Sequence, residues 1–170
     1  MPLPKCVKVN EHDHVSRETL EGEGWRYVGT LDTYEGEIDR EFDREVDRRV
    51  TKATPDEAWN IATNIDWTGR LWRDFEIPTI EAWAETERFI RSDEYSLYKI
   101  GGAAFGIFDE ERIALIGVHP AAQGLGLAER LIRNQFSFVR AGTYSDNTPA
   151  IKLYRRLGMK FISSQAVFHK

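Results

Sequence analysis

The residues best suited to chemistry lie in one stretch, Val118 to Ala128, which reads VHPAAQGLGLA. An apolar strand pattern ends there, and a loop with two glycines, Gly124 and Gly126, leads into the pattern of an amphipathic helix. The first amides of a helix have no partner within the helix and carry a partial positive charge, so such a helix start can bind an anion. Because glycine lacks a side chain, a phosphate can approach the backbone closely. The stretch therefore predicts an anion cradle, formed by the amides of residues 124–128.

Two common phosphate-binding motifs do not fit this stretch. A dinucleotide fingerprint needs a third glycine at position 129, which is Glu129, and the Gly-Lys-Ser/Thr triplet of a Walker loop is absent. The segment Gln123-Gly124-Leu125-Gly126-Leu127-Ala128 resembles instead the pyrophosphate loop of the GCN5-related N-acetyltransferases (GNAT), whose pattern is Gln/Arg-x-x-Gly-x-Gly/Ala. Taken alone, the segment could also be an ordinary glycine-rich turn before a helix.

A second segment, residues 146–158, reads DNTPAIKLYRRLG. Thr148 is predicted to cap a helix, with Pro149 at its first position. The apolar residues that recur at spacings of three and four are Ala150, Leu153 and Leu157. The segment resembles the GNAT pattern Asn-x-x-Ala-x-x-Leu-Tyr-x-x-x-Gly-Phe, with Met159 in place of the usual aromatic residue. Alone, Tyr154 would be read as an amphipathic helix residue, but the two segments in this order favour the resemblance.

The resemblance covers about residues 50–170 and implies an α/β (α+β) fold. In that fold helices cover both faces of a mixed central sheet, and the parallel fourth and fifth strands of the family splay apart around acetyl-CoA. Backbone groups near Ile116 and Val118 would pair with the pantetheine arm, the anion cradle would hold the pyrophosphate, and Asn147 would contact the cofactor. The residues implied to bind acetyl-CoA are Ile116, Val118, Gln123, Gly124, Leu125, Gly126, Leu127, Ala128 and Asn147. No metal is implied.

Tyr154 is the predicted catalytic residue. A departing CoA thiolate, whose thiol has a pKa of about 8.5, needs a proton, and a tyrosine with an ordinary pKa of about 10 can donate it. Direct transfer to the amine is favoured over a covalent acyl-enzyme because no cysteine or serine stands beside a plausible base. No single residue is indicated as the general base, so Asp74, Glu76, Asp109 and a water relay all remain candidates for it.

Residues 67–75, WTGRLWRDF, are the predicted acceptor loop. Arg70 and Arg73 can bind a carboxylate or phosphate through two hydrogen bonds, and Trp67 and Trp72 can stack on a base or sugar ring. The alternative is a surface loop whose aromatic residues are tucked into the core. Because this loop, the N-terminal strand unit and the last residues resemble dTDP-fucosamine acetyltransferase and related amino-sugar enzymes, a nucleotide-linked amino sugar is the expected acceptor. A protein, peptide or small-amine acceptor, and a non-catalytic CoA-binding domain, stay open.

The pattern of the chain predicts the elements that position these motifs. Thr54, Pro55 and Glu57 predict a capped helix start, and a second helix is expected from Thr79 to about Arg91. Alternation from Ile38 to Val50 favours a strand from about Glu45, with a surface helix open for its first half. The remaining predicted elements are strands Ser96–Ile100, Ala103–Phe108 and Arg112–Val118, a helix from Gly124 to about Arg140, a strand Gly142–Ser145, a helix Pro149–Leu157 and a strand Lys160–His169.

Residues 1–44 are charged and weakly patterned, so we expect an N-terminal appendage there and the GNAT domain over residues 45–170. The residues Gly24 to Thr30 match Gly158 to Ser164 in residue class, position by position. Each stretch follows a short helical pattern that contains leucine. Seven positions are too few to prove a repeat, but they hint that the appendage is a shortened relative of the C-terminal helix–strand unit.

Composition sets the wider expectations. A chain of 170 residues can bury one proper core, and a net charge of −5 argues against a nucleic-acid surface. No apolar run is long enough to span a bilayer and no signal-peptide core is present, so no membrane partner is expected. The single cysteine, Cys6, is expected to be buried or incidental and fits a reducing, cytoplasmic setting. His12 and His14 are expected in a solvated turn rather than a metal site. The oligomeric state stays open, with a homodimer as one candidate.

Overall fold

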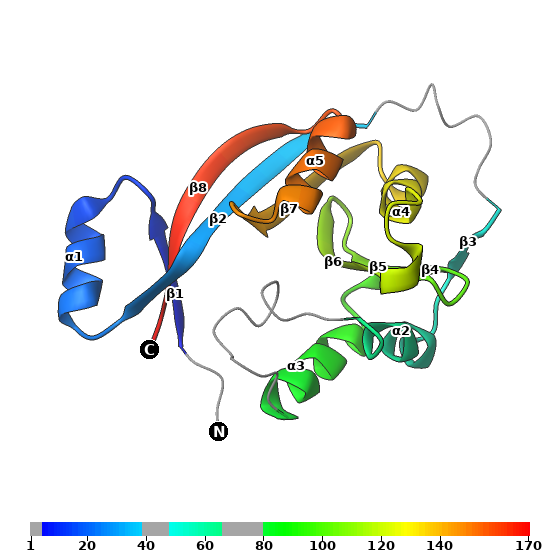
Figure 1. The fold of residues 1–170 in the computed structure, drawn as a ribbon, viewed down its shortest axis with the longest axis horizontal. Helices are drawn as coiled ribbons and strands as arrows, with labels where there is room; N and C mark the ends of the chain where they lie inside the picture. Colours follow the sequence, from blue (N-terminus) through cyan, green and yellow to red (C-terminus); the bar gives the residue numbers. More distant parts are fainter. Residues whose placement is uncertain (1–4, 39–47, 66–79) are drawn as a thin grey trace.

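A computed structural model of the protein describes residues 5–38, 48–65 and 80–170, and within them the strands form one mixed sheet (Figure 1). The strand order across the sheet is β1-β8-β2-β7-β6-β5-β4-β3. The strands are β1 (Cys6–Asn10), β2 (Arg26–Glu37), β3 (Val50–Lys52), β4 (Ser96–Ile100), β5 (Ala104–Phe108), β6 (Arg112–Val118), β7 (Phe138–Tyr144) and β8 (Lys160–His169). The helices are α1 (His14–Gly22), α2 (Pro55–Ala62), α3 (Ile80–Ile90), α4 (Leu127–Gln135) and α5 (Thr148–Arg156), with a 3₁₀ turn η1 (Pro120–Ala122).

Helices pack against both faces of the sheet, which confirms the predicted fold class. The inner residues of α4 and α5 share one apolar cluster with Ala104 and Phe108 of β5. Those of α2 and α3 share a second cluster with Phe105 and Ile107, which point to the opposite face because side chains alternate along a strand. All five residues of β5 are buried as a result.

The strands β6 and β7 run parallel but stay together only briefly. Arg112 pairs with Arg140 and Ile113 pairs with Ala141, and no further pair joins the two strands in the described structure. Beyond that point β6 keeps its partner β5 as far as Val118, and β7 keeps its partner β2 as far as Tyr144. The two halves of the sheet therefore splay apart at this line, as the GNAT resemblance implied.

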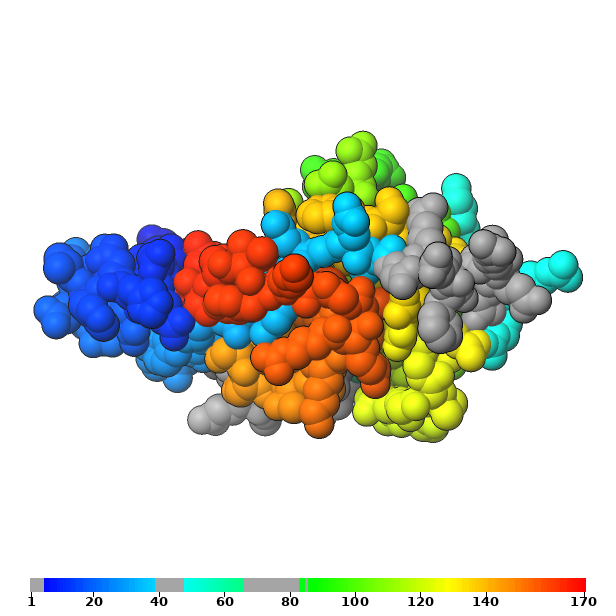
Figure 2. Space-filling view, turned by 90° about the horizontal axis from the view of Figure 1, so that it is seen from above, coloured from blue at the N-terminus to red at the C-terminus, as the bar shows by residue number. Residues whose placement is uncertain are grey.

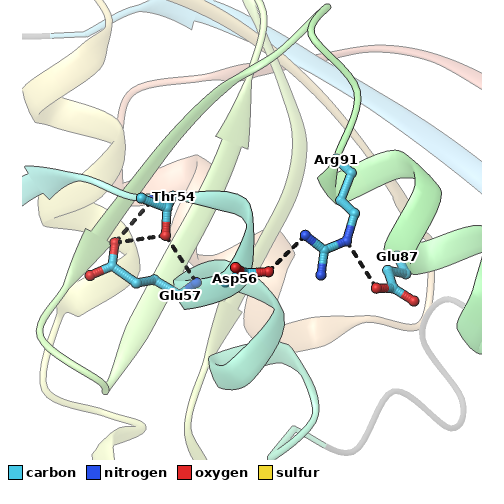
Figure 3. Close-up of polar contacts among 5 residues, drawn as sticks. All are labelled: Thr54, Asp56, Glu57, Glu87 and Arg91. Carbon is cyan, nitrogen blue, oxygen red and sulfur yellow. Dashed lines mark hydrogen bonds and ion pairs between the residues drawn. The ribbon is translucent and has the colours of Figure 1, made fainter.

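The first helix after the sheet's edge strand β3 begins where the sequence predicts. Thr54 Oγ1 accepts a hydrogen bond from the Glu57 amide at 3.3 Å, and a carboxylate oxygen of Glu57 accepts one from the Thr54 amide at 2.9 Å (Figure 3). Arg91, just after α3, then ties α3 to α2 by reaching Asp56 at 2.7 Å and Glu87 at 2.9 Å. These ion pairs are exposed, so they fix geometry more than they add stability.

Several predicted boundaries are wrong. The strand predicted as Gly142–Ser145 is β7, which already begins at Phe138 and ends at Tyr144. The helix predicted from Gly124 to about Arg140 spans only Leu127–Gln135, because both glycines of the loop have positive φ and Phe136 is already extended. Val139 is buried as expected, but it points inward from β7, where an alternating pattern replaces the helical one. A further error concerns the cap of α5: Asn147, not Thr148, is the N-cap, and its side chain accepts from the Ala150 amide.

The N-terminal residues contribute to the same sheet. β2 lies between β7 and β8, and β1 adds the edge strand beyond β8. The division of the chain at residue 44 stays a prediction. Of the strand predicted from about Glu45, residues 45–47 lie outside the described residues, residues 48 and 49 form a turn, and β3 begins at Val50. Cys6 is exposed on β1 rather than buried, and His12 and His14 are exposed. Within the described residues, no helix is long and apolar enough to cross a membrane.

Candidate active site

A cavity of about 630 Å³ lies where β6 and β7 separate. It is lined by β6, by the loop into α4, by β7 and by α5, so it brings the two sequence motifs together. Of the residues predicted to bind acetyl-CoA, only Leu125 does not line it, and that side chain is 65% exposed. The predicted residues that do line the cavity are Ile116, Val118, Gln123, Gly124, Gly126, Leu127, Ala128, Asn147 and Tyr154.

The loop geometry fits the predicted anion cradle. Gly124 and Gly126 have φ values of +81° and +74°, a region that favours glycine, and no heavy atom lies within 4 Å of where a Cβ would stand. No side chain caps α4, whereas Asp13, Thr54 and Asn147 cap the other helices whose N-caps are described. The first amides of α4 are therefore left open beside the cavity, and these are the donors that a diphosphate needs.

The charges around the anion cradle favour a polyanion. The one acidic residue in the first turn of α4 is Glu129, which is held by Arg133 at 3.0 Å and by Arg156 of α5 at 3.6 Å. Lys152 and Arg156 both line the cavity. Neither side chain was predicted from the sequence, although Lys152 and Arg156 are four positions apart and so lie on the same face of α5.

The strand β6 supplies the other wall. Ile116 and Val118 are half-buried, and beyond Ile113 the edge of β6 that faces β7 has no strand partner in the described structure. An extended ligand such as a pantetheine arm could bond to these backbone groups. The Gln123 amide group donates to the Val118 carbonyl at 3.4 Å and so closes the base of the loop. His119 accepts from the Ala121 amide at 3.2 Å, a structural role at the start of η1.

Asn147 lies on the cavity but is already engaged by the fold. Its carbonyl oxygen accepts from the Ala150 amide at 3.5 Å, and its amide group donates to the Thr143 hydroxyl at 2.9 Å. These bonds orient the side chain at the start of α5. Its contact with acetyl-CoA stays a prediction.

Tyr154 is almost completely buried, with 4% of its surface exposed, and it lines the cavity. Its ring lies 5.8 Å from the ring of Tyr34 on β2. Burial raises the pKa of Tyr154 to about 12, above the ordinary value of about 10 assumed from the sequence. The hydroxyl is therefore protonated throughout the neutral range, where it can act as a general acid but not as a general base.

The structure does not bear on the predicted acceptor residues. Trp67, Arg70, Trp72 and Arg73 lie outside the described residues, as do the candidate bases Asp74 and Glu76. Asp109, the third candidate base, does not line the cavity. It pairs with Arg112 at 3.5 Å in the turn between β5 and β6. Among the described residues, no group of three or more His, Cys, Asp or Glu side chains could hold a metal ion.

Comparison with known proteins identifies this part of the chain. The family profile described as the acetyltransferase (GNAT) domain matches residues 88–160, a range that contains the anion cradle and α5. This part of the chain, less than half of its length, is therefore similar to GNAT acetyltransferase domains. Over 66 residues the chain is also 33% identical to the N-alpha-acetyltransferase RimI of Mycobacterium tuberculosis, a match that covers 36% of this chain and 42% of RimI.

Solved structures share the fold of the chain. A GCN5-related N-acetyltransferase from Sphaerobacter thermophilus superposes with a TM-score of 0.60 at 17% identity, over 98% of this chain and 60% of that one. An acetyltransferase described as putative from Pyrococcus horikoshii gives 0.61 at 13% identity, over 97% and 52%. A tandem GNAT protein from the clavulanic acid biosynthesis pathway gives 0.55 at 14% identity, over 99% and 63%. The chain thus spans less than two thirds of each of these relatives.

Proposed function

We propose that the protein is an acyl-CoA-dependent N-acyltransferase that moves an acetyl group from acetyl-CoA directly to a primary amine. The observation that carries the proposal is one cavity, opened by the separation of β6 and β7, that holds both the uncapped start of α4 and the buried hydroxyl-bearing side chain of Tyr154. The first group suits a diphosphate and the second suits a departing thiolate.

In the proposed binding mode the anion cradle holds the pyrophosphate of acetyl-CoA. Lys152 and Arg156 add positive charge along the same wall. The pantetheine arm follows the free edge of β6 near Ile116 and Val118, and brings the thioester toward Tyr154. Asn147 contacts the arm from the start of α5.

In the proposed reaction a neutral amine attacks the thioester carbon, a C–N bond forms, and the C–S bond breaks. The thiolate takes its proton from Tyr154, the new amide loses its extra proton to a base or to water, and the Tyr154 phenolate then regains a proton from solvent. In water a phenol with a pKa of about 12 would be a weak donor to a thiolate whose thiol has a pKa of about 8.5. In the proposed complex the desolvation that raises the pKa of Tyr154 also raises the pKa of the CoA thiol, so the difference between the two pKa values becomes smaller.

Two acceptor classes have support. The resemblance of residues 67–75 and both ends of the chain to amino-sugar enzymes supports a nucleotide-linked amino sugar. The identity with RimI, described as an N-alpha-acetyltransferase, supports the α-amine of a peptide. Both classes present a primary amine, so the cavity chemistry is the same and only the acceptor surface differs.

Release of free CoA thiol from acetyl-CoA tests the proposal. We expect release that depends on one acceptor class in a panel of short peptides, nucleotide-linked amino sugars and simple amines. A Gly126→Val variant, which forces a branched side chain into positive φ, should weaken acetyl-CoA binding. Tight binding of acetyl-CoA without thiol release for any amine would contradict the proposal and favour a non-catalytic CoA-binding domain.

A further inference from the structure

The N-terminal unit β1–α1–β2 recurs, element by element, 134 positions later as β7–α5–β8. Helices α1 and α5 each have nine residues, and His14 and Thr148 begin them. Each helix is capped by the side chain of the preceding residue, Asp13 or Asn147, which accepts from the amide three positions on. Each is followed by a glycine at the same offset, Gly24 with φ +84° and Gly158 with φ +86°. The match first seen over seven residues of sequence thus extends over the whole unit.

The backbone hydrogen bonds repeat with the same offset. The Trp25 amide donates to the Leu20 carbonyl at 2.9 Å. At the equivalent place the Met159 amide donates to the Tyr154 carbonyl at 3.0 Å. Three more amide-to-carbonyl bonds of the first unit have an equivalent in the second. They are Asp13 to Asn10 (equivalent to Asn147 to Tyr144), Gly24 to Glu21 (Gly158 to Arg155) and Glu23 to Thr19 (Leu157 to Leu153).

The strand pairing shows that the two units are related by a pseudo-two-fold axis. In the antiparallel pair of β2 with β8, Leu31 faces Gln165 at the centre. The registers and both irregularities of that pair are symmetric about this point, since Tyr27 faces Phe168 and its equivalent Phe161 faces Tyr34. Under the same operation the pairing of β1 with β8 becomes the pairing of β7 with β2.

The surroundings of the two units are not the same. The outer edge of β7 joins β6, and α5 shares an apolar cluster with Leu127 and Leu131 of α4. The outer edge of β1 has no strand partner in the described structure, and none of the residues of α1 is buried (Figure 1). In Figure 2 this unit projects as one end of the molecule. Val15 is 76% exposed there, and Leu20 occupies the place that Tyr154 has in α5.

We propose that β1 and α1 form a docking surface for the strand–helix half of a second GNAT core. The docked strand would run parallel to β1, just as β6 runs parallel to β7. The amphipathic helix that follows this strand would pack on α1, just as α4 packs on α5. The argument is continuity with the interface already present inside the chain, since the same backbone unit presents the same edge. Matched structures that cover 97% or more of this chain extend well beyond it, and one of them is described as a tandem GNAT protein.

A second copy of this chain fits the surface less well. The edge of β6 in that copy is already taken by its own β7. Antiparallel pairing of two β1 strands about their centres would set Lys8 opposite Lys8, and like charges directly opposite one another are destabilising. The surface is also not expected to form a second catalytic site, because Leu20 and Asp13 replace Tyr154 and Asn147.

An extended chain tests the proposal, with residues 48–138 of this protein placed directly before Lys5. Phe138 then takes the position of Pro4, so the connection from α4 to β7 is reproduced at β1. By the register of β6 with β7, residue 112 of the added segment should face Cys6, the equivalent of Arg140. Cys6 is the single cysteine of the chain and is exposed, so an Arg112→Cys change in the added segment creates a unique pair.

We expect this pair to form an intramolecular disulfide with oxidised glutathione as the oxidant, since neighbouring strands hold paired residues at disulfide distance. A matched variant with Ile116→Cys in the added segment, beyond the splay, should not form one. Hydrogen exchange of β1 and α1 should slow on the order of a hundredfold on extension, while β7 and α5 report that the parent fold is intact. Leu131→Asp in the added segment alone should reverse this protection.

Unchanged exchange of β1 and α1 with β7 and α5 still protected, or equal disulfide yields at positions 112 and 116, would overturn the proposal. A dimer of the original chain whose formation protects β1 and α1 would overturn it as well, in favour of a second copy. Aggregation of the extended chain with α5 exposed would count against the docking geometry. Acyl transfer enters none of these readouts, so their failure is distinct from failure of the proposed function.

Discussion

The units β1–α1–β2 and β7–α5–β8 have the same backbone and different chemistry. In both, a nine-residue helix is capped by one side chain and ends at a glycine with positive φ. In the described structure only the second unit lies against α4 and β6, and the cavity lies between its α5 and those two elements. The difference shows that the helix–glycine–strand unit is a scaffold, and that its chemistry arises when a neighbouring layer encloses a polar side chain such as Tyr154.

The helix starts show the same contrast on a smaller scale. Among the helices whose N-caps are described, a side chain caps α1, α2 and α5, but no side chain caps α4. A side-chain cap satisfies the open amides and so removes them from ligand binding. The uncapped helix is the one beside the cavity, which is what a site for an anion requires.

The largest expected effect separates Tyr154 from its equivalent Leu20. Tyr154→Phe should slow acetyl transfer by about tenfold to a thousandfold, with little change in acetyl-CoA binding, because one general acid is lost. Leu20→Phe is the matched control and should leave turnover unchanged. Steady-state thiol release and isothermal titration with acetyl-CoA measure the two quantities. Normal turnover of Tyr154→Phe would remove Tyr154 from the mechanism.

The second effect concerns stability at alkaline pH. Because the folded pKa of Tyr154 is about 12 and the unfolded pKa about 10, the unfolded chain loses its proton first as the pH rises. The contribution of the Tyr154 hydroxyl to stability is fully present below pH 10. About 2 to 3 kcal/mol of the free energy of unfolding should be lost between pH 10 and 12. Urea unfolding of wild type and Tyr154→Phe at pH 9 to 11.5 isolates this loss. Parallel pH profiles for the two proteins would contradict the assigned burial.

The third effect compares Gly24 and Gly158, the glycines that follow α1 and α5. An alanine at either position must adopt a left-handed conformation, which costs about 1–2 kcal/mol. Gly158→Ala should lower the global free energy of unfolding by this amount, because α5 is part of the core. Gly24→Ala should change global stability less and instead raise local hydrogen exchange in α1, since α1 can open without disrupting the core. Equal global losses would mean that α1 is as cooperative with the fold as α5.

The smallest effect concerns the caps of α1 and α5, Asp13 and Asn147, at low pH. The hydroxyl of Ser16 at 2.6 Å and its amide at 3.0 Å hold the pKa of Asp13 below its usual range. That cap is complete above the ordinary carboxyl pKa and should be lost as the pH falls through the lowered one. Carbon chemical shifts should then report less helix in α1 below about pH 4, while α5, capped by uncharged Asn147, keeps its shifts. Asp13→Asn should abolish the change in α1.

Elements with strong local signals were predicted well. Thr54, Pro55 and Glu57 carry a complete capping signal, and α2 begins where they predict. The strands β4, β6 and β8 have the predicted bounds. The end of α4 was missed because Ile132, Phe136 and Val139 continue a helical spacing, while the competing alternation begins at Val139 and runs through β7. Local pattern could not decide between the two, and the pairing of β7 with β2 did.

The candidate site divides in the same way. Gly124 and Gly126 stand out in sequence because each satisfies a requirement that is local to a turn, whereas Tyr154 stands out only through the resemblance of its segment to the GNAT pattern. Leu31, which also lines the cavity, has no such signal, since β2 reaches β7 from more than a hundred residues away. Whether a candidate side chain lines a cavity depends on packing between distant elements.

By itself, the sequence determined several local conformations of the chain: the glycine loop before α4, the capped start of α2, and the strands β4, β6 and β8. These follow from interactions within a few residues, such as a side chain bonding to a nearby amide or a glycine accepting positive φ. Only the tertiary structure decided that β6 and β7 part after two residue pairs, that Tyr154 is buried with a raised pKa, and that β1–α1–β2 matches β7–α5–β8. Those properties depend on desolvation and strand pairing between segments far apart in the chain, which no local pattern encodes.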